Sequence, residues 1–374
     1  MRIAYLIAGT YNSGGMERVL ANKANYLVAH GYEVIIITTD QHGQKPFFPL
    51  DQRIKCYDLG INYEENNGKS FFNKVLHYPL KQWRHKKRLS ELLKKLHADV
   101  VVSMFCNDAS ILPQIKDGSK KVLEVHFSRF KRLQYGRKGL WKWADKWRSN
   151  NDLKVVSRFD RFVVLTKEDK VYWGNLHNIQ VIPNARTFAF EKPAELTNKT
   201  VMAVGRYDFQ KGFERLIAAW AEVCNKVNDW KLEIIGDGAL RDKMLQQIEE
   251  NGLNDRVVLK KLPAAQMKDA YMNTSIFALS SRFEGLPMVL LEAQAAGVPI
   301  VSFACKCGPK DLIEDGINGF LVEEGDIDGL AKGLIRLIED EELRKKMGKA
   351  AYQNSELYTE NAIMKHWIDL FQNL

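Results

Sequence analysis

The stretch from Ile276 to Phe303, IFALSSRFEGLPMVLLEAQAAGVPIVSF, contains one complete unit of the fold. Two short apolar runs, Ile276–Leu279 and Pro299–Phe303, enclose Met288–Ala296, whose leucines and alanines are typical of a buried helix. Continuous apolar runs of this kind indicate parallel strands that are buried on both faces. The stretch therefore predicts a strand, a helix and a second strand.

The same alternation recurs on both sides of this unit. Before it, strands are predicted at 3–8, 34–39, 100–103, 122–125 and 161–166, with a helix at 16–30. Further strands are predicted at 201–204, 232–235, 257–259 and 320–322, with helices at 213–226, 239–251, 264–273 and 327–338. Repeated βαβ units predict an α/β fold class with two Rossmann-like, doubly wound domains.

A polar linker, Pro183–Thr200, separates the two series of strands. We therefore expect an N-terminal domain over residues 1–185 and a C-terminal domain over residues 186–355. The tail, 356–374, is predicted to be helical because Ile363, Trp367 and Leu370 recur at helical spacing. Ligands of open α/β sheets bind beyond the carboxyl ends of the strands, which predicts a cleft between the two domains.

The charge of the chain is unevenly distributed. There are 55 Lys and Arg against 46 Asp and Glu, a net charge of +9. Residues 69–97 hold nine cations against one Glu, and residues 126–161 hold eleven against three Asp. This excess points to an anionic partner, which can be a phosphate ligand, a nucleic acid or a membrane surface. The 45% apolar content excludes a disordered chain or a coiled-coil rod.

The five cysteines have no regular spacing, which favours reduced thiols in a cytosolic protein over a disulfide framework. Cys305 and Cys307 lack a second pair that would complete a zinc site, so no metal is expected. The apolar run after Met1 is too short for a signal peptide. No run of about 18 apolar residues could span a membrane.

Two cations follow the first strand of the second series. Arg206 comes directly after the strand, and Lys211 precedes the next helix. Two cations at a helix N-terminus can bind a diphosphate, and the alternative is an exposed loop. Gly236, in the run Gly-Asp-Gly at 236–238, indicates a tight turn at the next strand end, where Asp237 is a candidate helix cap.

The segment from Ser280 to Glu292 gives the strongest local signal. Gly285 permits unusual backbone conformations, and Pro287 suits a first helical turn, which leaves backbone N–H groups for an anionic oxygen. Glu292 lies five residues after Pro287, about 7–8 Å further along the helix axis. There its carboxylate can accept hydrogen bonds from both hydroxyls of a ribose. Glu284 can bind sugar hydroxyls in the same way. The alternative is a capping Glu284 and a solvated Glu292, which the apolar helix disfavours.

Two further strand ends carry candidate residues. Gly14 and Gly15 follow the first strand and precede Glu17 and Arg18, and they either let the backbone approach a phosphate or form a plain turn. The absence of G-x-G-x-x-G disfavours a dinucleotide cofactor. His126 follows the strand at 122–125 and is either a structural histidine or part of the site.

The ordered set of motifs resembles the family 4 glycosyltransferases, which have two Rossmann domains in the GT-B arrangement. The resemblance covers nearly the whole chain and rests on E-x7-E at 284–292, with 14–18, 181–184, 205–212 and 236–238. It implies a donor-binding C-terminal domain, an acceptor-binding N-terminal domain, and a C-terminal helix that crosses back onto the latter. Ala185 and the run Lys-Cys-Gly-Pro at 306–309 depart from the glycine-rich family pattern.

The resemblance also implies residue roles. Arg206 and Lys211 would hold the donor diphosphate, while Glu284 and His126 would lie at the transferred sugar. Glu292 would bind the ribose. The other implied donor contacts are Gly14, Gly15, Gly236, Gly285, Leu286, Pro287 and Met288. Acceptor contacts are expected from Glu17, Arg129, Lys131 and Arg132.

The resemblance implies a retaining transfer of a sugar from a nucleotide-sugar to a glycan hydroxyl, with a UDP-sugar as the donor because the family mostly uses one. The nucleotide-sugar is a substrate, so no cofactor is expected. The D-x-D run at Asp326–Asp328 reads as a helix cap. Fixed charges on Arg206 and Lys211 can stabilise the departing diphosphate, so catalysis without a metal is expected.

The segment 127–148 predicts contact with an anionic membrane. Leu140, Trp143, Ala144 and Trp147 recur at helical spacing among eight cations, which is typical of an interfacial helix. We expect a cytoplasmic, peripheral enzyme whose glycan acceptor is polyprenyl-linked, in bacterial-type polysaccharide biosynthesis. The alternative is that Trp143 and Trp147 pack into the domain core.

Two other functions compete with glycosyl transfer. A nucleic-acid-binding protein would use the basic stretches, but no recognition module is visible and the charge avoids the C-terminal domain, so no nucleic-acid partner is expected. A sugar-nucleotide epimerase of the same fold needs a further acid–base pair that the sequence does not provide.

Overall fold

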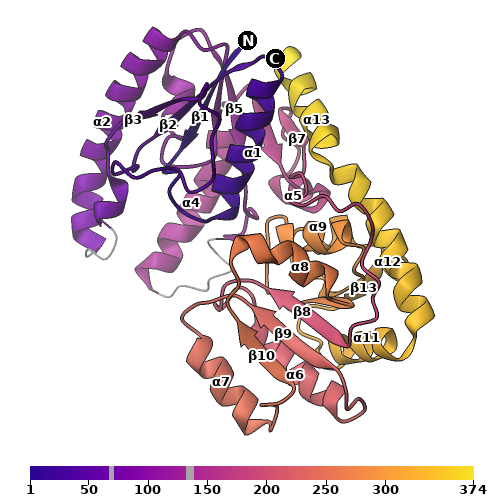
Figure 1. Ribbon diagram of the computed structural model, residues 1–374. Helices are drawn as coiled ribbons and strands as arrows, with labels where there is room; N and C mark the ends of the chain where they lie inside the picture. Colours follow the sequence, from indigo (N-terminus) through magenta and orange to yellow (C-terminus); the bar gives the residue numbers. More distant parts are fainter. Residues whose placement is uncertain (67–70, 132–138) are drawn as a thin grey trace.

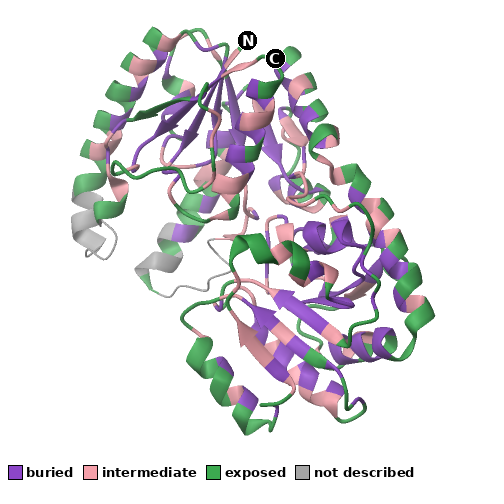
Figure 2. Ribbon diagram, viewed as in Figure 1, coloured by how far each residue is buried: buried purple, intermediate pink, exposed green. Residues whose placement is uncertain are grey.

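The computed structural model describes residues 1–66, 71–131 and 139–374 and shows two α/β domains stacked one above the other (Figure 1). Each domain is an open, parallel sheet with helices on both faces. Buried residues concentrate in the strands, whereas the outer faces of the helices are exposed (Figure 2). The predicted fold class is therefore confirmed.

The N-terminal sheet has seven parallel strands in the order β3-β2-β1-β4-β5-β6-β7. The sequence did not predict β3, β7 or the helix α2, which is strongly basic and contains Pro79. The strands are β1 Arg2–Ile7, β2 Glu33–Thr38, β3 Lys55–Asp58, β4 Val100–Ser103, β5 Lys120–Glu124, β6 Arg161–Val164 and β7 Ile179–Val181, and the helices are α1 Gly15–Ala29, α2 Phe71–Leu96, α4 Leu140–Val156 and α5 Lys167–Trp173.

The C-terminal sheet has six parallel strands in the order β10-β9-β8-β11-β12-β13. Asp326 accepts a hydrogen bond from the Gly329 amide (2.9 Å), so the D-x-D run is a helix cap, as predicted. The strands are β8 Thr200–Val204, β9 Lys231–Ile235, β10 Val257–Lys260, β11 Ile276–Leu279, β12 Ile300–Phe303 and β13 Gly319–Val322, and the helices are α6 Phe213–Cys224, α7 Arg241–Glu250, α8 Met267–Met272, α9 Met288–Ala295, α10 Pro309–Leu312 and α11 Ile327–Glu339.

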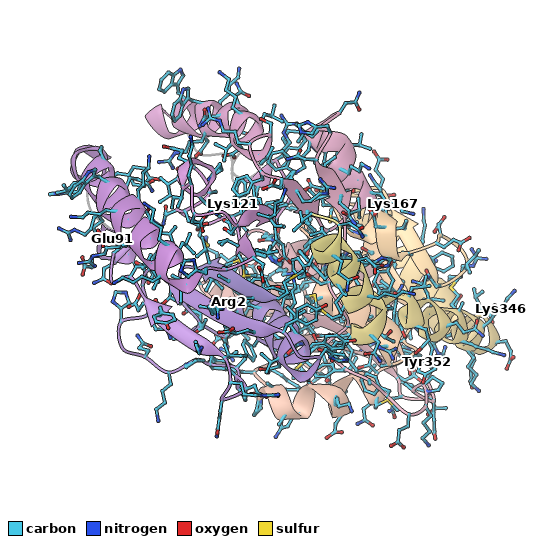
Figure 3. The ribbon with its side chains drawn as sticks, turned by 90° about the horizontal axis from the view of Figure 1, so that it is seen from above. Arg2, Glu91, Lys121, Lys167, Lys346 and Tyr352 are labelled. Atoms are coloured by element: carbon cyan, nitrogen blue, oxygen red, sulfur yellow. The ribbon has the colours of Figure 1, made fainter. Side chains whose placement is uncertain are left out.

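Two helices at the end of the chain connect the domains. α12 (Glu341–Ser355) packs against α9, whereas α13 (Glu360–Gln372) returns to the N-terminal domain (Figure 1). Ile363, Trp367 and Leu370 of α13 lie in one hydrophobic cluster with Ile3 and Tyr5 of β1. Seen from above, Glu91 of α2 and Lys346 of α12 lie on opposite sides of the molecule (Figure 3).

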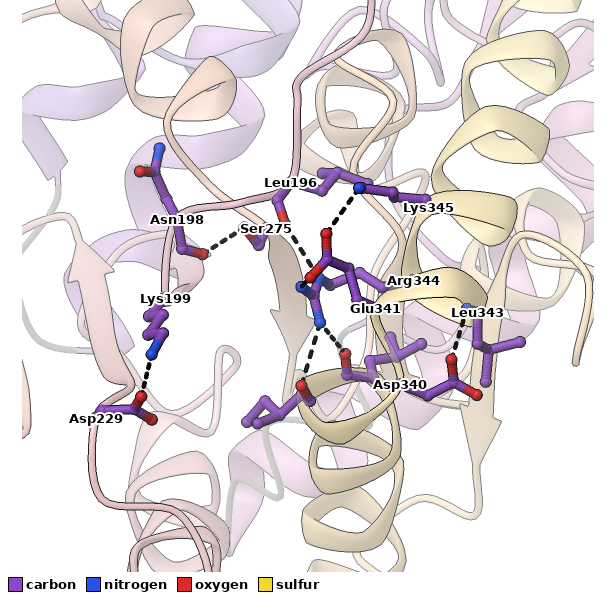
Figure 4. A network of polar contacts seen from close by, with 12 residues as sticks. Leu196, Asn198, Lys199, Asp229, Ser275, Asp340, Glu341, Leu343, Arg344 and Lys345 are labelled. Atoms are coloured by element: carbon purple, nitrogen blue, oxygen red, sulfur yellow. Dashed lines mark hydrogen bonds and ion pairs between the residues drawn. The ribbon is translucent and has the colours of Figure 1, made fainter.

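Arg344 of α12 fixes the linker that precedes β8 (Figure 4). Its guanidinium is buried and donates to the carbonyl oxygens of Leu196 in the linker (3.1 Å), and of Leu337 (2.7 Å) and Ile338 (3.2 Å) at the end of α11. These bonds satisfy carbonyls that a helix end leaves unpaired. Arg344 thus ties the linker to the C-terminal helices.

Within the described part of the chain, no helix has both the length and the apolar composition needed to cross a bilayer.

Candidate functional site

The two domains meet at the carboxyl ends of their strands, where Gly285 of the β11–α9 loop faces the segment after β5. A Cβ atom on Gly285 would lie 2.6 Å from the His126 carbonyl oxygen and 3.0 Å from Phe127 Cα. The absence of a side chain therefore permits this contact. This contact brings Glu284 and His126, which are far apart in sequence, to the same junction between the domains.

Glu284 and Lys211 form an ion pair in the C-terminal domain, with Nζ 2.7 Å from Oε1. The Ser281 hydroxyl donates to the same oxygen (2.6 Å). The stem of Lys211 lies over Gly205, where a Cβ would be 2.9 Å from Lys211 Cε. Since Lys211 and Glu284 are both largely buried, their charges are fixed at the junction rather than free in solvent.

Arg206 is placed differently from Lys211. Its side chain is 74% exposed and pairs with Asp208 at 3.2 Å. The convergence of two cations that the sequence predicted is therefore seen for Lys211 but not for Arg206. In this structure, Arg206 reaches toward solvent from the same strand end.

The Gly-Asp-Gly turn after β9 is dictated by close packing. A Cβ on Gly236 would lie 1.9 Å from the Gly205 carbonyl oxygen, so this position tolerates only glycine. Asp237 pairs with Lys261 at 2.7 Å, and Leu240 is the N-cap residue of α7. The alternative in which Asp237 caps the helix is thus wrong, because its carboxylate is turned to the residue that follows β10.

α9 begins at Met288, as predicted, but Pro287 is its N-cap residue rather than part of the first turn, so Leu286 and Gly285 form the approach to the helix. Glu292 is buried on this helix and accepts a hydrogen bond from the Tyr271 hydroxyl (2.8 Å). Burial raises the pKa of Glu292, and the hydrogen bond opposes that rise. The solvated alternative for Glu292 is therefore wrong.

At the first strand end, Gly14 is the N-cap residue of α1, and Gly15 faces open space. A Cβ on Gly14 would lie 2.2 Å from Glu17 Oε2, so the glycine lets the Glu17 carboxylate fold back over the turn. Burial raises the pKa of Glu17, while the charge of His126 opposes this rise. The acceptor role of Glu17 stays a prediction.

Three predicted acceptor contacts lie on the segment after β5. The guanidinium of Arg129 donates to the Tyr172 carbonyl and lies 5.4 Å from the centre of the Trp173 ring, so it packs within its own domain. Lys131 lies over the Phe127 ring at 5.0 Å. Arg132 falls outside the described residues. The acceptor roles of all three stay predictions.

The run at 306–309, which departs from the family pattern, forms part of the contact between the domains. Gly308 has a positive φ of 101°, and a Cβ there would lie 2.2 Å from Pro287 Cδ. The Cys307 amide donates to Glu168 of α5 (2.9 Å). The Asp311 carboxylate accepts from the Lys167 amide (2.6 Å), so a residue of the C-terminal domain caps a helix of the N-terminal one.

Several site residues were missed by sequence reasoning. Tyr271 binds Glu292, and Lys23 and Glu124 lie beside His126, where Lys23 Nζ is 2.6 Å from Glu124 Oε1. A signal existed for Glu124 alone, because it is a charged residue within the apolar run at 122–125 and a buried charge requires a partner. Among the described residues, no three His, Cys, Asp or Glu side chains are grouped as metal ligands.

Two family models match adjacent parts of the chain. "Glycosyltransferase Family 4" matches residues 13–186, and "Glycosyl transferases group 1" matches residues 185–354. Their shared boundary falls in the linker between β7 and β8. Each model therefore corresponds to one of the two sheets.

Related proteins align over nearly the entire chain. An uncharacterized glycosyltransferase from Haemophilus influenzae is 33% identical over 98% of both chains. The amylovoran biosynthesis glycosyltransferase AmsD of Erwinia amylovora is 28% identical over 99% of both. An alpha-1,4-N-acetyl-D-galactosaminyltransferase of Campylobacter jejuni, named for a PP-undecaprenol-linked glycan, is 28% identical over 99% of this chain and 98% of its own.

The same architecture occurs in TarM of S. aureus, a mutant of which was crystallised with fondaparinux, alpha-GlcNAc-glycerol and UDP. That structure has a TM-score of 0.76, 17% identity and 99% coverage of both chains, which shows the shared fold. The family models together reach from residue 13 to residue 354, and a relative above 30% identity aligns from end to end. On these grounds the chain belongs to the family 4, group 1 glycosyltransferases with the GT-B fold.

Proposed function

We propose that this enzyme transfers a sugar, with retention of anomeric configuration, from a UDP-sugar to a hydroxyl of a polyprenyl-linked glycan in polysaccharide biosynthesis. The observation that carries the proposal is the placement of Glu284, Lys211 and Glu292 around the start of α9. Lys211 is ion-paired with Glu284, which precedes the start of α9 by four residues, and the buried carboxylate of Glu292 lies further along that helix. A nucleoside diphosphate matches this spacing.

Each group then has a chemical task. Lys211 and Arg206 offset the negative charge that develops on the departing diphosphate, which removes the need for a metal. Glu284 accepts hydrogen bonds from sugar hydroxyls, and Glu292 accepts from the ribose. The UDP in the TarM complex supports this choice of donor.

A lipid-linked acceptor is supported by the Campylobacter relative and by exposed aromatic side chains on the N-terminal domain. Trp143 and Trp147 on α4 are 72% and 58% exposed, so the alternative that they pack into the core is wrong. Trp83 on α2 is also exposed, at 62%. Exposed tryptophans among basic residues suit the interface of an anionic, cytoplasmic-face membrane.

The test is a transfer assay with purified enzyme. UDP- and GDP-sugars are offered with a polyprenyl-diphosphate-linked glycan or with the same free glycan, in the presence of EDTA. We expect transfer from a UDP-sugar to the lipid-linked acceptor, with the product's anomeric configuration, read by NMR, equal to that of the donor. Strict Mg²⁺ dependence, an inverted product or a preference for free sugars would contradict the respective part of the proposal.

A further inference from the structure

A buried charge network next to His126 joins residues of β5, α1, α13 and β1. Glu124, the last residue of β5, is 1% exposed. Its Oε1 atom lies 2.6 Å from Lys23 Nζ of α1 and 3.2 Å from His126 Nε2. One carboxylate oxygen therefore faces both a lysine and the predicted catalytic histidine.

Lys23 also contacts two aromatic rings, in addition to Glu124. Its ammonium lies 3.6 Å from the centre of the Trp367 ring on α13 and 5.9 Å from that of the Tyr5 ring on β1. Aromatic faces attract cations most strongly where water is excluded. The C-terminal helix thus supports the lysine that holds Glu124.

Glu124 stays ionised in this setting. Burial acts to raise the pKa of Glu124, but the attraction of Lys23 and then of His126 outweighs burial and brings the pKa to about 2. The second oxygen of Glu124, Oε2, has no hydrogen-bond partner among the described residues. The carboxylate therefore keeps a full charge and spare acceptor capacity next to the imidazole.

The contact with His126 is close but not aligned. Nε2 is within 3.2 Å of Glu124 Oε1, yet in the described structure it forms no hydrogen bond of good geometry. Catalytic hydrogen bonds are often long or poorly aligned before substrate binds and become shorter in the complex.

We propose that Glu124, held by Lys23, is a positioning residue that orients His126 for glycosyl transfer. This inference rests on the proposed function, in which His126 meets the transferred sugar. A carboxylate behind an imidazole fixes which nitrogen carries the proton and stabilises the charged ring. Lys23 of α1 and Glu124 of β5 form the orienting pair, and Trp367 of α13 packs against Lys23.

A double-mutant cycle tests the proposal. Glu124→Gln is expected to lower kcat about 10–100-fold, the range seen for carboxylates that orient a metal-bound histidine, while donor KM and UDP affinity stay within about 3-fold. In a His126→Asn background the same change is expected to cost less than about 3-fold, because its target is gone. An equal loss in both backgrounds would overturn the inference.

A matched control separates positioning from stability. Asp117 forms a buried pair with Lys121, the second residue of β5, at the end of the strand opposite to Glu124. Asp117→Asn is expected to lower Tm and to leave kcat unchanged. Should Glu124→Gln fail to fold, Lys23→Met with Glu124→Gln removes both charges, and the cycle is run with that pair.

The two proposals fail in different ways. Wild-type enzyme that neither binds UDP nor transfers from any nucleotide-sugar contradicts the proposed function. An active wild type with additive effects in the cycle contradicts the positioning role alone.

Discussion

Lys211 is the cation that the structure places against Glu284, and its removal should affect the chemical step. Lys211→Ala is expected to lower kcat by on the order of 10²–10³, as for the loss of one preorganised charge at a transition state. Arg206→Ala should lower kcat similarly without changing Tm, since that side chain is exposed. Lys261→Ala, at an exposed ion pair, is the control and should keep kcat. Near-normal turnover in both site variants would refute the role of fixed cations.

Glu292 should act mainly on donor binding. The ribose lies away from the reacting carbon, so its contact is similar in the ground and transition states. Glu292→Ala is expected to raise donor KM about 10–100-fold, the effect of losing a charged hydrogen bond, with kcat changed little. Tyr271→Phe leaves the carboxylate in place and should have a smaller effect. An unchanged KM with a collapsed kcat would contradict this assignment.

Asp108 makes stability depend on pH. Burial raises the pKa of Asp108 to about 6, and its Oδ2 atom has no hydrogen-bond partner in the described structure. Because the folded-state pKa is raised, its contribution to stability is fully present below about pH 4 and is lost as the pH rises through 6. Asp108→Asn does not titrate, so its stability relative to wild type should increase by about 3 kcal/mol between pH 4 and pH 8. Urea unfolding of both proteins at pH 4 and pH 8 measures this change. A difference in the free energy of unfolding that does not depend on pH would refute the prediction.

Residues that follow strands were predictable, whereas their partners were not. Glu284, Glu292 and His126 are marked by strand ends and by helix-start chemistry that can be read locally. Tyr271 and Lys23 reach them from other elements, and only the three-dimensional packing shows which side chain each carboxylate meets. The direction of Arg206 was equally unpredictable, because a loop side chain can turn to either side of its strand end.

At the scale of elements, the strand–helix pattern predicted most of both sheets but missed the ends of the N-terminal one. β3 is a short strand of exposed residues, so it lacks the apolar run by which the other strands were recognised. α2 is a continuous but strongly basic helix that contains Pro79, a residue type that usually ends a helix, and its leucines recur at helical spacing only toward its C-terminal end. Edge strands and solvated helices carry weak burial signals, and burial was the basis of the prediction.

The β11–α9 loop and the segment after β5 form an element-level contact that depends on Gly285. Gly285→Ala would place a Cβ 2.6 Å from the His126 carbonyl, a backbone atom that cannot rotate away. We expect the two domains to separate slightly, with kcat lower by about 10-fold, as for a small misplacement of reacting groups, and with an unchanged Tm. Small-angle scattering should show a larger radius of gyration. Wild-type activity together with unchanged scattering would show that the contact is not required.

At the scale of the whole molecule, the two domains differ in charge and in surface. The basic stretches 69–97 and 126–161 both lie in the N-terminal domain, and the rest of the chain carries more acidic than basic residues. In Figure 1, the N-terminal ends of α2 and α4 point to the same side of that domain. The basic residues are thus gathered on the N-terminal domain, which makes it the domain expected to meet an anionic surface.

Membrane docking should follow from this asymmetry and should require both tryptophans and charge. Wild-type protein is expected to float with vesicles containing anionic lipid at low salt and to be released at high salt, where cations near the surface are screened. Each Lys or Arg near the membrane surface contributes about 1 kcal/mol to the free energy of binding, so several such residues suffice for reversible binding to the vesicle. Trp143→Ser with Trp147→Ser removes two exposed rings and should weaken flotation without lowering Tm, because neither ring is part of a core.

Leu357→Ser, at an exposed apolar residue between the last two helices, is the control and should float as wild type. If the wild-type protein does not bind the vesicles at low salt, membrane docking is wrong. If binding is salt-sensitive but unchanged in the double tryptophan variant, charge alone is responsible for docking.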